Sequence, residues 1–410
     1  MAKLAVEADP AELGLDPGRL ARIDRHFQAY VDDGRLPGYL LAVTRGGCIA
    51  YVASYGRRDV EAGSPVEDDT IYRIYSMTKP ITSVAAMMLY EEGAFALKDP
   101  VADYIGAFAD QRVYTRGNPF LPATAPATEP VRIWHLLTHT SGLTYGFHYA
   151  NPVDAMYRNA GFELGTPPGM DLAGAVDAWA SMPLLFNPGE EWNYSVSTDV
   201  LGRLVEVVSG QSLDRVFAER IFGPLGMADT GFSIPEADHE RQAALYWATP
   251  ANQLQRADAA RDEVRTPPAL LSGGGGLAGT AYDYHRFTQM LLNGGELDGV
   301  RLLSDRTVDY MTINHLPGDA DIEEFGRPLF PEDTYEGVGF GLGFSVVIDP
   351  AATKTLGSPG LFAWGGAAST AFWVDPLEEL TTLFFTQVIP SNQYPIRTEL
   401  QQLVYQALVD

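Results

Sequence analysis

The sequence predicts an α+β fold: one antiparallel sheet of about five strands, built from both ends of the chain and flanked by helices, plus an inserted helical domain. Strand-like segments follow one another without an intervening helix near both termini, which is typical of antiparallel pairing. The middle of the chain carries helical periodicity and many loop residues. We expect a sheet domain formed by residues 1–95 and 285–410, a mainly helical domain formed by residues 96–284, and an active site in the cleft between them.

The first predicted elements are a helix and a hairpin. Asp16 followed by Pro17 is typical of a helix N-cap and first turn, and Gly34 is a plausible stop. Residues 39–44 and 48–55 are predicted strands, joined by a turn of the sequence Arg-Gly-Gly. The apolar face of the helix consists of Leu20, Ile23, Phe27 and Tyr30.

The C-terminal part adds three predicted strands and a closing helix. Residues 340–348, 364–374 and 381–388 are rich in Val, Phe, Thr and Trp and are bounded by Gly, Pro or Asp, which indicates strands. Residues 395–408 are predicted as an amphipathic helix. Its apolar face consists of Ile396, Leu400, Leu403 and Ala407.

The chain of 410 residues is strongly acidic. It has 28 Lys and Arg against 53 Asp and Glu, a net charge of -25. Such a surface repels phosphate backbones and anionic lipids, so we expect neither nucleic-acid nor membrane binding. No apolar run reaches membrane-spanning length, the first residues lack the apolar core of a signal peptide, and the single cysteine, Cys48, fits a reducing compartment. We therefore expect a cytoplasmic protein and leave its oligomeric state open.

The best nucleophile candidate is Ser76. It precedes a helical pattern, and Lys79 follows three residues later, so the two side chains share a helix face. Free backbone N–H groups at a helix N-terminus can stabilise a developing oxyanion. A neutral lysine can accept the serine proton, whereas an arginine cannot, and 24 of the 28 basic residues here are arginines. Because Ser-x-x-Lys is short, a helix N-cap serine alone would also explain Ser76.

Tyr194 is the candidate for a second proton carrier. It ends the stretch Pro-Gly-Glu-Glu-Trp-Asn-Tyr, just before another helical pattern. A neighbouring ammonium would lower the pKa of its phenol, which would let it shuttle a proton between the serine and the leaving group. The alternative is an ordinary buried tyrosine. No Gly-x-Ser-x-Gly occurs, which argues against an α/β-hydrolase nucleophile elbow.

Several short motifs, in a fixed order through most of the chain, resemble the serine β-lactamase and penicillin-binding-protein superfamily. The likeness is closest to class C β-lactamases and family VIII carboxylesterases. The motifs are Ser76-Met77-Thr78-Lys79, residues 136–143 (LLTHTSGL), Pro188-Gly189 leading to Tyr194-Ser195, residues 221–227 (IFGPLGM), residues 276–280 (GLAGT) and Trp364-Gly365-Gly366. The fold that the resemblance implies, an antiparallel sheet with helices and a helical domain, agrees with the prediction from the pattern.

The resemblance implies a role for each matched residue. Ser76 is the acyl-accepting nucleophile, Lys79 the adjacent base and Tyr194 the second proton shuttle. The backbone N–H groups of Ser76 and Ala367 would form the oxyanion hole. Which of Lys79 and Tyr194 is the formal base stays open, because interacting groups titrate together. Neither a cofactor nor a metal is implied.

Two departures from class C β-lactamases favour the esterase branch. Val196 stands where those enzymes have the asparagine of Tyr-x-Asn, and Trp364-Gly365-Gly366 stands in place of Lys-Thr-Gly. An indole that replaces a cation removes a favourable contact with an anionic substrate. Trp364 would then line an apolar pocket. The alternative, at about even odds, is that Trp364 is an ordinary tryptophan of the hydrophobic core. The predicted substrate pocket consists of Trp364, Gly365, Gly366, Tyr145, Phe147 and Val196.

The expected function is therefore hydrolysis of short-chain carboxylic esters, as small-molecule substrates, through an acyl-serine intermediate. Weak hydrolysis of β-lactams is left open as a side activity. The alternatives are a β-lactamase, a D-amino-acid peptidase, an acyltransferase to an alcohol other than water, and a non-catalytic scaffold. His135 and His139 have the spacing of a metal pair, but no third ligand is evident, and we expect no metal site.

Overall fold

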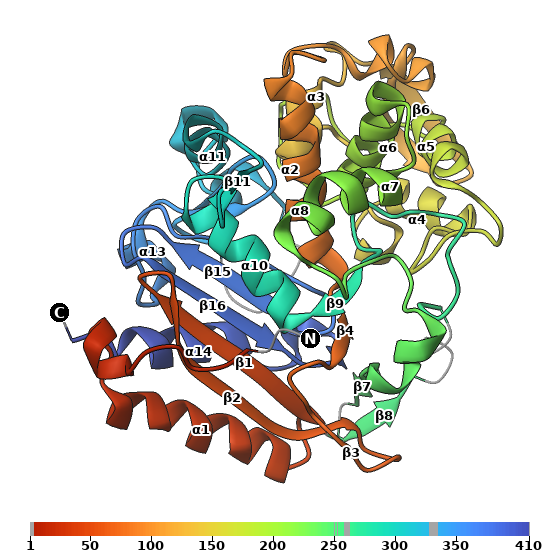
Figure 1. Cartoon of the computed structure of the whole chain (residues 1–410). Helices are drawn as coiled ribbons and strands as arrows, with labels where there is room; N and C mark the ends of the chain where they lie inside the picture. The colour runs from red at the N-terminus through yellow and green to blue at the C-terminus, as the bar shows by residue number, and fades with distance from the viewer. Residues whose placement is uncertain (1–3, 250, 252, 258–262, 328–334, 410) are drawn as a thin grey trace.

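The sheet is central to the computed structural model, which describes residues 4–249, 251, 253–257, 263–327 and 335–409 (Figure 1). It has eight strands in the order β12-β13-β14-β15-β16-β1-β2-β3, and each neighbouring pair is antiparallel. The two ends of the chain meet where Leu40 of β1 lies opposite Phe385 of β16. The strands are β1 (Gly38–Arg45), β2 (Cys48–Asp59), β3 (Ser64–Pro65), β12 (Val338–Phe340), β13 (Ser345–Val347), β14 (Phe362–Gly365), β15 (Ala371–Asp375) and β16 (Leu380–Phe385).

The α+β class and the antiparallel sheet built from both termini are confirmed, but two predicted strands were wrong in their extent. Residues 340–348 contain the end of β12, a turn in which Gly343 adopts φ +101°, and β13, so the predicted single strand is interrupted by a turn. Residues 364–374 form β14 and β15, separated by a tight turn in which the Gly366 N–H donates to Thr370 O. The sheet is therefore larger than the five strands expected, and Trp364 lies near the end of a strand.

One face of the sheet is covered by α1 (Pro17–Asp32) and α14 (Ile396–Tyr405), which lie side by side (Figure 1). The side chain of Asp16 caps α1 by accepting from the Arg19 N–H at 2.8 Å, as predicted. Because side chains alternate along a strand, Leu41 faces these helices while Leu40 faces the opposite core. The core on the α1 side includes Leu20, Ile23, Phe27, Leu400 and Val404.

The other face is covered by α10 (Ala281–Leu292), which packs on β1, β15 and β16. Beside it, α2 (Thr78–Glu91) is almost entirely buried and packs against α6 (Ser197–Ser209). A two-stranded pairing of β4 (Ile71–Arg73) with β9 (Ala278–Thr280) precedes α2 and α10. α2 thus connects the sheet layer with the helical region, and its first residues lie between the two.

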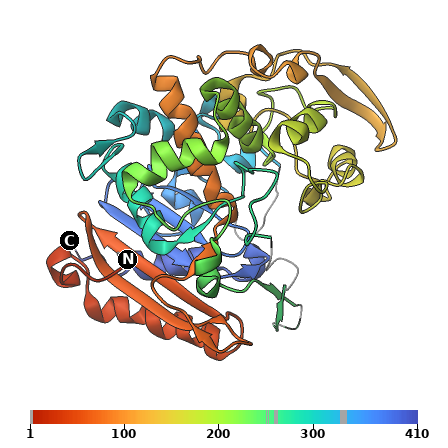
Figure 2. The same ribbon diagram turned by 45° about the vertical axis from the view of Figure 1, so that its right-hand side comes forward.

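The helical region contains α3 to α8 and one hairpin, β5–β6, which extends along its outer edge (Figure 2). The predicted domain limits at residues 95/96 and 284/285 remain a prediction. None of the helices described is both long and apolar enough to cross a membrane. The elements are α3 (Ile133–Leu137), α4 (Pro152–Asn159), α5 (Leu172–Ala180), α7 (Leu213–Phe217), α8 (Gly223–Leu225), β5 (Arg112–Asn118) and β6 (Leu121–Pro126).

The remaining elements are short and lie in the connections. The strands β7, β8 and β17 form a small sheet, and β10 and β11 form a two-stranded ribbon after α10. These elements are β7 (Tyr246–Ala248), β8 (Leu254–Arg256), β10 (Glu296–Leu297), β11 (Val300–Arg301), α11 (Asp305–Met311), α12 (Ile322–Phe325), α13 (Pro350–Thr353) and β17 (Val388–Ile389).

Candidate active site

Ser76 lies in a single 3-10 turn, η2 (Tyr75–Met77), that leads directly into α2. Its Oγ is 3.2 Å from Nζ of Lys79, so the three-residue spacing does bring the two side chains together. Tyr75, immediately before it, adopts φ +44°, a left-handed conformation that costs a non-glycine residue on the order of 1 kcal/mol. The backbone is thus held in a strained conformation next to the candidate nucleophile.

Lys79 is buried at 2% exposure and is surrounded by aromatic rings and backbone. Its Nζ donates to Gly274 O at 2.7 Å and lies 4.4 Å from the ring centre of Tyr194 and 5.4 Å from that of Tyr145. Burial lowers the pKa of the Lys79 ammonium to about 7, and the nearby Asp199 carboxylate opposes this effect. Near neutral pH the lysine is therefore present both as an ammonium and as a free amine.

Tyr194 completes a hydrogen-bonded chain with Ser76. Its hydroxyl donates to Ser76 Oγ at 2.7 Å and accepts from the indole N–H of Trp364 at 3.3 Å. The expectation of a lowered phenol pKa was wrong: burial raises the pKa of Tyr194, and the hydrogen bonds from its neighbours only partly offset that. Tyr194 is therefore a neutral phenol, suited to donating a proton.

The end of β14 is shaped by its two glycines. A side chain at Gly365 would overlap the guanidinium of Arg397 from α14, which donates to the Gly366 and Thr370 carbonyls at 3.3 and 3.4 Å. A Cβ at Gly366 would lie 2.5 Å from Ile74 O, closer than real Cβ atoms come. The strand end can therefore pack tightly against the segment that leads into Ser76.

The predicted oxyanion-hole amides lie on these two adjoining segments. Ala367 is exposed in the turn after β14, next to Gly366, whose Cα packs against Ile74 O. Within the described residues, neither the Ser76 N–H nor the Ala367 N–H donates to a protein acceptor. Both amides are thus available to a ligand.

Of the other predicted pocket residues, Tyr145, Phe147 and Trp364 lie near Tyr194, whereas Val196 lies in the hydrophobic core. The ring of Tyr145 is 5.3 Å from that of Tyr194, and Phe147 stacks on Tyr145 at 4.6 Å, so this aromatic pair lies beside the Ser76–Lys79 pair. Trp364 contacts Tyr194 and packs edge-on against Phe340. Val196, by contrast, is 4% exposed and belongs to the main hydrophobic core.

Asp199 is a neighbour of the site that the sequence did not single out. It lies in the first turn of α6 at 4% exposure and accepts hydrogen bonds from Ser272 Oγ at 2.5 Å and from the Gly274 N–H at 3.0 Å. Gly274 is the same residue whose carbonyl accepts from Lys79. No short motif joins residues 199 and 274, so only their contact in the fold identifies them.

The two histidines with metal-pair spacing are engaged elsewhere. His135 Nδ1 accepts from the Arg132 N–H, and His139 Nδ1 lies 3.2 Å from Ser195 Oγ, with its ring against that of Tyr194. Burial lowers the pKa of His139 well below its usual value. Over the ranges that the structure describes, three or more His, Cys, Asp or Glu side chains do not gather in a way that could hold a metal ion.

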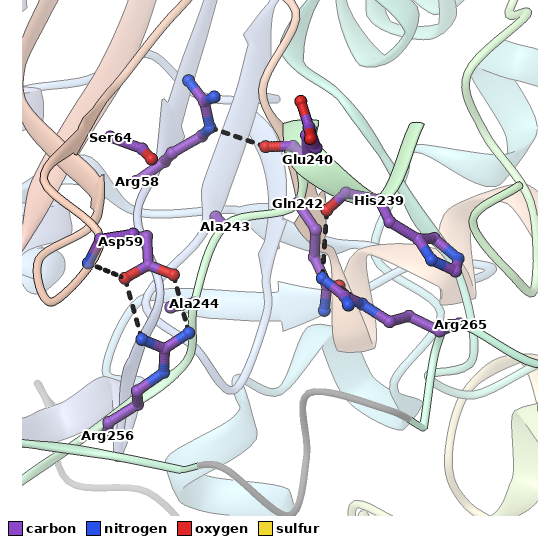
Figure 3. A pocket seen from close by; sticks show the side chains of 11 residues that line it. Arg58, Asp59, Ser64, His239, Glu240, Gln242, Ala243, Ala244, Arg256 and Arg265 are labelled. Atoms are coloured by element: carbon purple, nitrogen blue, oxygen red, sulfur yellow. Dashed lines mark hydrogen bonds and ion pairs between the residues drawn. The ribbon is translucent and has the colours of Figure 1, made fainter. Parts of the chain in front are cut away.

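A separate surface pocket of about 400 Å³ lies between β2 and the chain segment before β7 (Figure 3). Asp59 and Arg256 form a two-pronged ion pair there at 2.7 and 2.9 Å, and Arg58 donates to Glu240 O. Arg265 donates to Gln242 at 2.7 Å. None of the predicted site residues lines this pocket, so it is distinct from the candidate active site.

The comparisons with known proteins cover nearly the whole chain. The model of the Beta-lactamase family matches residues 23–406. Esterase EstB of Burkholderia gladioli is 32% identical over 98% of this chain and 99% of its own. Protein Rv1367c of Mycobacterium tuberculosis is 39% identical over 88% of each chain.

Among solved structures, EstCE1, described as a hydrolase with promiscuous acyltransferase activity, superposes with a TM-score of 0.80. It is 26% identical, and the match covers 95% of this chain and 99% of that one. These findings confirm the resemblance to the serine β-lactamase and penicillin-binding-protein superfamily, and the esterases among the similar proteins support the family VIII branch.

Proposed function

Because this chain belongs to the β-lactamase family, we propose that its serine hydrolase chemistry is the cleavage of carboxylic esters with short acyl chains through an acyl-serine intermediate. The observation that carries the proposal is the hydrogen bond from the Trp364 indole to the Tyr194 hydroxyl. A neutral, aromatic donor occupies the place of a cation that would attract an anionic substrate, and it leaves an apolar surface beside Ser76.

In the acylation step, Ser76 Oγ attacks the ester carbonyl carbon and its proton passes to the free amine of Lys79. The geometry supports this assignment: Lys79 Nζ lies 3.2 Å from Ser76 Oγ, and burial lowers the pKa of Lys79, so a free amine lies within reach of the serine proton. The carbonyl oxygen becomes an oxyanion, which the N–H groups of Ser76 and Ala367 stabilise. When the C–O bond to the leaving alcohol breaks, Tyr194 donates its proton to the alkoxide, and the Lys79 ammonium restores the proton of Tyr194.

Deacylation repeats the same steps with water in place of Ser76. The proton of the attacking water passes to the free amine of Lys79, with the Tyr194 hydroxyl as a relay, and the Lys79 ammonium then returns a proton to Ser76 Oγ as Ser76 leaves. Where an alcohol takes the place of water, the product is a new ester. Acyl transfer is therefore the second candidate function, and the description of the similar protein EstCE1 as a hydrolase with acyltransferase activity favours it.

The test is hydrolysis of p-nitrophenyl esters from acetate to octanoate, alongside nitrocefin, by the wild type and by Ser76→Ala. We expect the rate to be highest for short esters, weak or absent for nitrocefin, and abolished by Ser76→Ala. Ser83→Ala is the matched control, because Ser83 is a buried serine of α2, the helix that follows Ser76.

Each other outcome selects an alternative. Faster turnover of nitrocefin than of the esters would make the protein a β-lactamase and overturn the argument from Trp364. If no ester were hydrolysed, a D-amino-acid peptidase or a non-catalytic scaffold would be favoured, and turnover of D-alanyl peptides would separate these two. Full ester turnover by Ser76→Ala would reject Ser76 as the nucleophile.

A further inference from the structure

Asp199 is a buried carboxylate that is linked to the candidate base, Lys79, through one intervening residue, Gly274. It accepts from the Gly274 N–H at 3.0 Å, and the carbonyl of the same glycine accepts from Lys79 Nζ at 2.7 Å. Lys79 Nζ is in turn 3.2 Å from Ser76 Oγ. The backbone of Gly274 therefore connects the carboxylate to Lys79, and Lys79 contacts the serine hydroxyl.

The loop that carries Gly274 is held from two sides. Thr82 Oγ1 of α2 donates to Gly273 O at 2.7 Å, and a Cβ at Gly273 would lie 2.9 Å from Thr198 O of α6. A Cβ at Gly274 would overlap the carboxylate of Asp199. The carboxylate thus packs directly on the loop, and a shift of Asp199 would move the acceptor of Lys79.

Charge around Lys79 is otherwise scarce among the described residues that interact with it. Tyr145 and Tyr194 present neutral phenols, because burial raises the pKa of both. His139, from the segment after α3, is neutral because burial lowers its pKa. Asp199, from α6, is the acid whose charge counteracts the effect of burial on the pKa of Lys79. Burial raises the pKa of Asp199 itself, and Lys79, Ser272 and the Gly274 N–H partly offset this by stabilising the carboxylate.

We propose that Asp199 is a positioning residue for the general base: through Gly274 it holds the Lys79 amine against the Ser76 hydroxyl, and it supplies a negative charge near that amine. This inference rests on the proposed function, in which Lys79 accepts the serine proton. The chain around the start of α6 would then contribute two residues to the site: Tyr194, just before the helix, and Asp199, in its first turn.

The test is the pH profile of kcat/KM for Asp199→Asn, which keeps an acceptor for the Gly274 N–H but removes the charge. Loss of an opposite charge makes the ammonium of Lys79 less stable. We therefore expect the acid limb of the profile, the range in which kcat/KM rises with pH, to move to lower pH by about one unit. A limb that stays at the wild-type pH, in a folded variant, would overturn the proposal, because a purely structural role would lower the plateau without moving the limb.

Asp283→Asn is the matched control. Asp283, at the start of α10, is also a buried carboxylate, but it accepts from Thr230 Oγ1 and the Asp229 N–H. The acid limb of Asp283→Asn should therefore stay in place.

If Asp199→Asn does not fold, Ser272→Ala replaces it, because it removes one donor from the Asp199 carboxylate without removing the carboxylate itself. We expect the acid limb to move by less than in Asp199→Asn, and an unchanged limb would again contradict the proposal.

A second readout separates this inference from the proposed function. The rate at which a fluorophosphonate labels Ser76 can be followed against pH without any ester substrate, and its limb should move with Asp199→Asn as well. If Ser76→Ala still hydrolysed esters, the proposed function itself would fail. If Ser76→Ala were inactive but the limb of Asp199→Asn matched the wild type, only the role of Asp199 would be rejected.

Discussion

The indole N–H of Trp364 donates to the hydroxyl of Tyr194 at 3.3 Å, although the two residues lie 170 positions apart in the chain. Tyr194 has one hydroxyl proton, and it is directed at Ser76 Oγ at 2.7 Å. The Tyr194 hydroxyl therefore links the indole of Trp364 to Ser76. Ser76 Oγ thus lies within hydrogen-bond distance of both the Tyr194 hydroxyl and Lys79 Nζ, and the predictions that follow test the part of each group.

Trp364→Phe removes the indole donor and keeps an aromatic side chain at the end of β14. We expect kcat/KM for p-nitrophenyl acetate to fall about five- to tenfold, as loss of one hydrogen bond of about 1 kcal/mol predicts. Trp373→Phe is the matched control, because the Trp373 N–H on β15 has no hydrogen-bond partner within the described residues. Equal losses in both variants would show that packing, rather than the donor, matters.

Tyr194→Phe removes the phenol hydroxyl and leaves the ring in contact with its neighbours. We expect kcat to fall by about 10²- to 10⁴-fold, because no group then donates a proton to the leaving alkoxide. The loss should be smallest for p-nitrophenyl esters, whose leaving group needs little protonation, and largest for alkyl esters. Tyr39→Phe, at a buried tyrosine on the opposite face of the sheet, should leave kcat unchanged.

The pH dependence of the reaction should follow the protonation of Lys79. Burial lowers the pKa of Lys79 to about 7, and the free amine is the form that accepts a proton. kcat/KM should therefore rise about tenfold per pH unit below pH 7 and level off above it. A profile that is flat from pH 5 to pH 9 would contradict Lys79 as the base.

Lys79→Arg tests the same assignment by keeping a positive charge at this position at every pH. An arginine stays protonated throughout this pH range, so we expect loss of activity by at least about 10²-fold at every pH measured. Lys98→Arg, at an exposed lysine, is the control and should behave as the wild type. Recovery of Lys79→Arg at high pH would point to another base.

Gly366→Ala tests the close packing of the turn that carries Ala367. The new Cβ would meet Ile74 O at 2.5 Å, so the turn has to move away from the segment that carries Ser76. Because the Ala367 N–H would move with it, we expect kcat to fall by about 10²-fold with a smaller change in KM. Gly106→Ala, where a Cβ meets nothing within 4 Å, should retain full activity.

Local patterns in the sequence predicted the elements that depend on near neighbours. The Asp16 cap of α1, the β1–β2 hairpin and the Ser76–Lys79 contact all join residues a few positions apart, and the structure has all of them. The prediction failed where a turn interrupts a strand-like stretch. Residues 364–374 are rich in strand-forming residues, but Gly366 packs against Ile74 O and the chain reverses there.

The pattern of strand-like and helical segments in the sequence alone determined the fold class. Its ordered motifs determined the family and the candidates Ser76, Lys79 and Tyr194, because spacing and order are properties of the chain itself. The tertiary structure alone decided the state and surroundings of these groups. Burial lowers the pKa of Lys79 and raises that of Tyr194. Trp364 and Asp199 reach the site from distant segments. Desolvation and contacts across the sheet depend on how distant segments pack, and no short window of sequence contains that information.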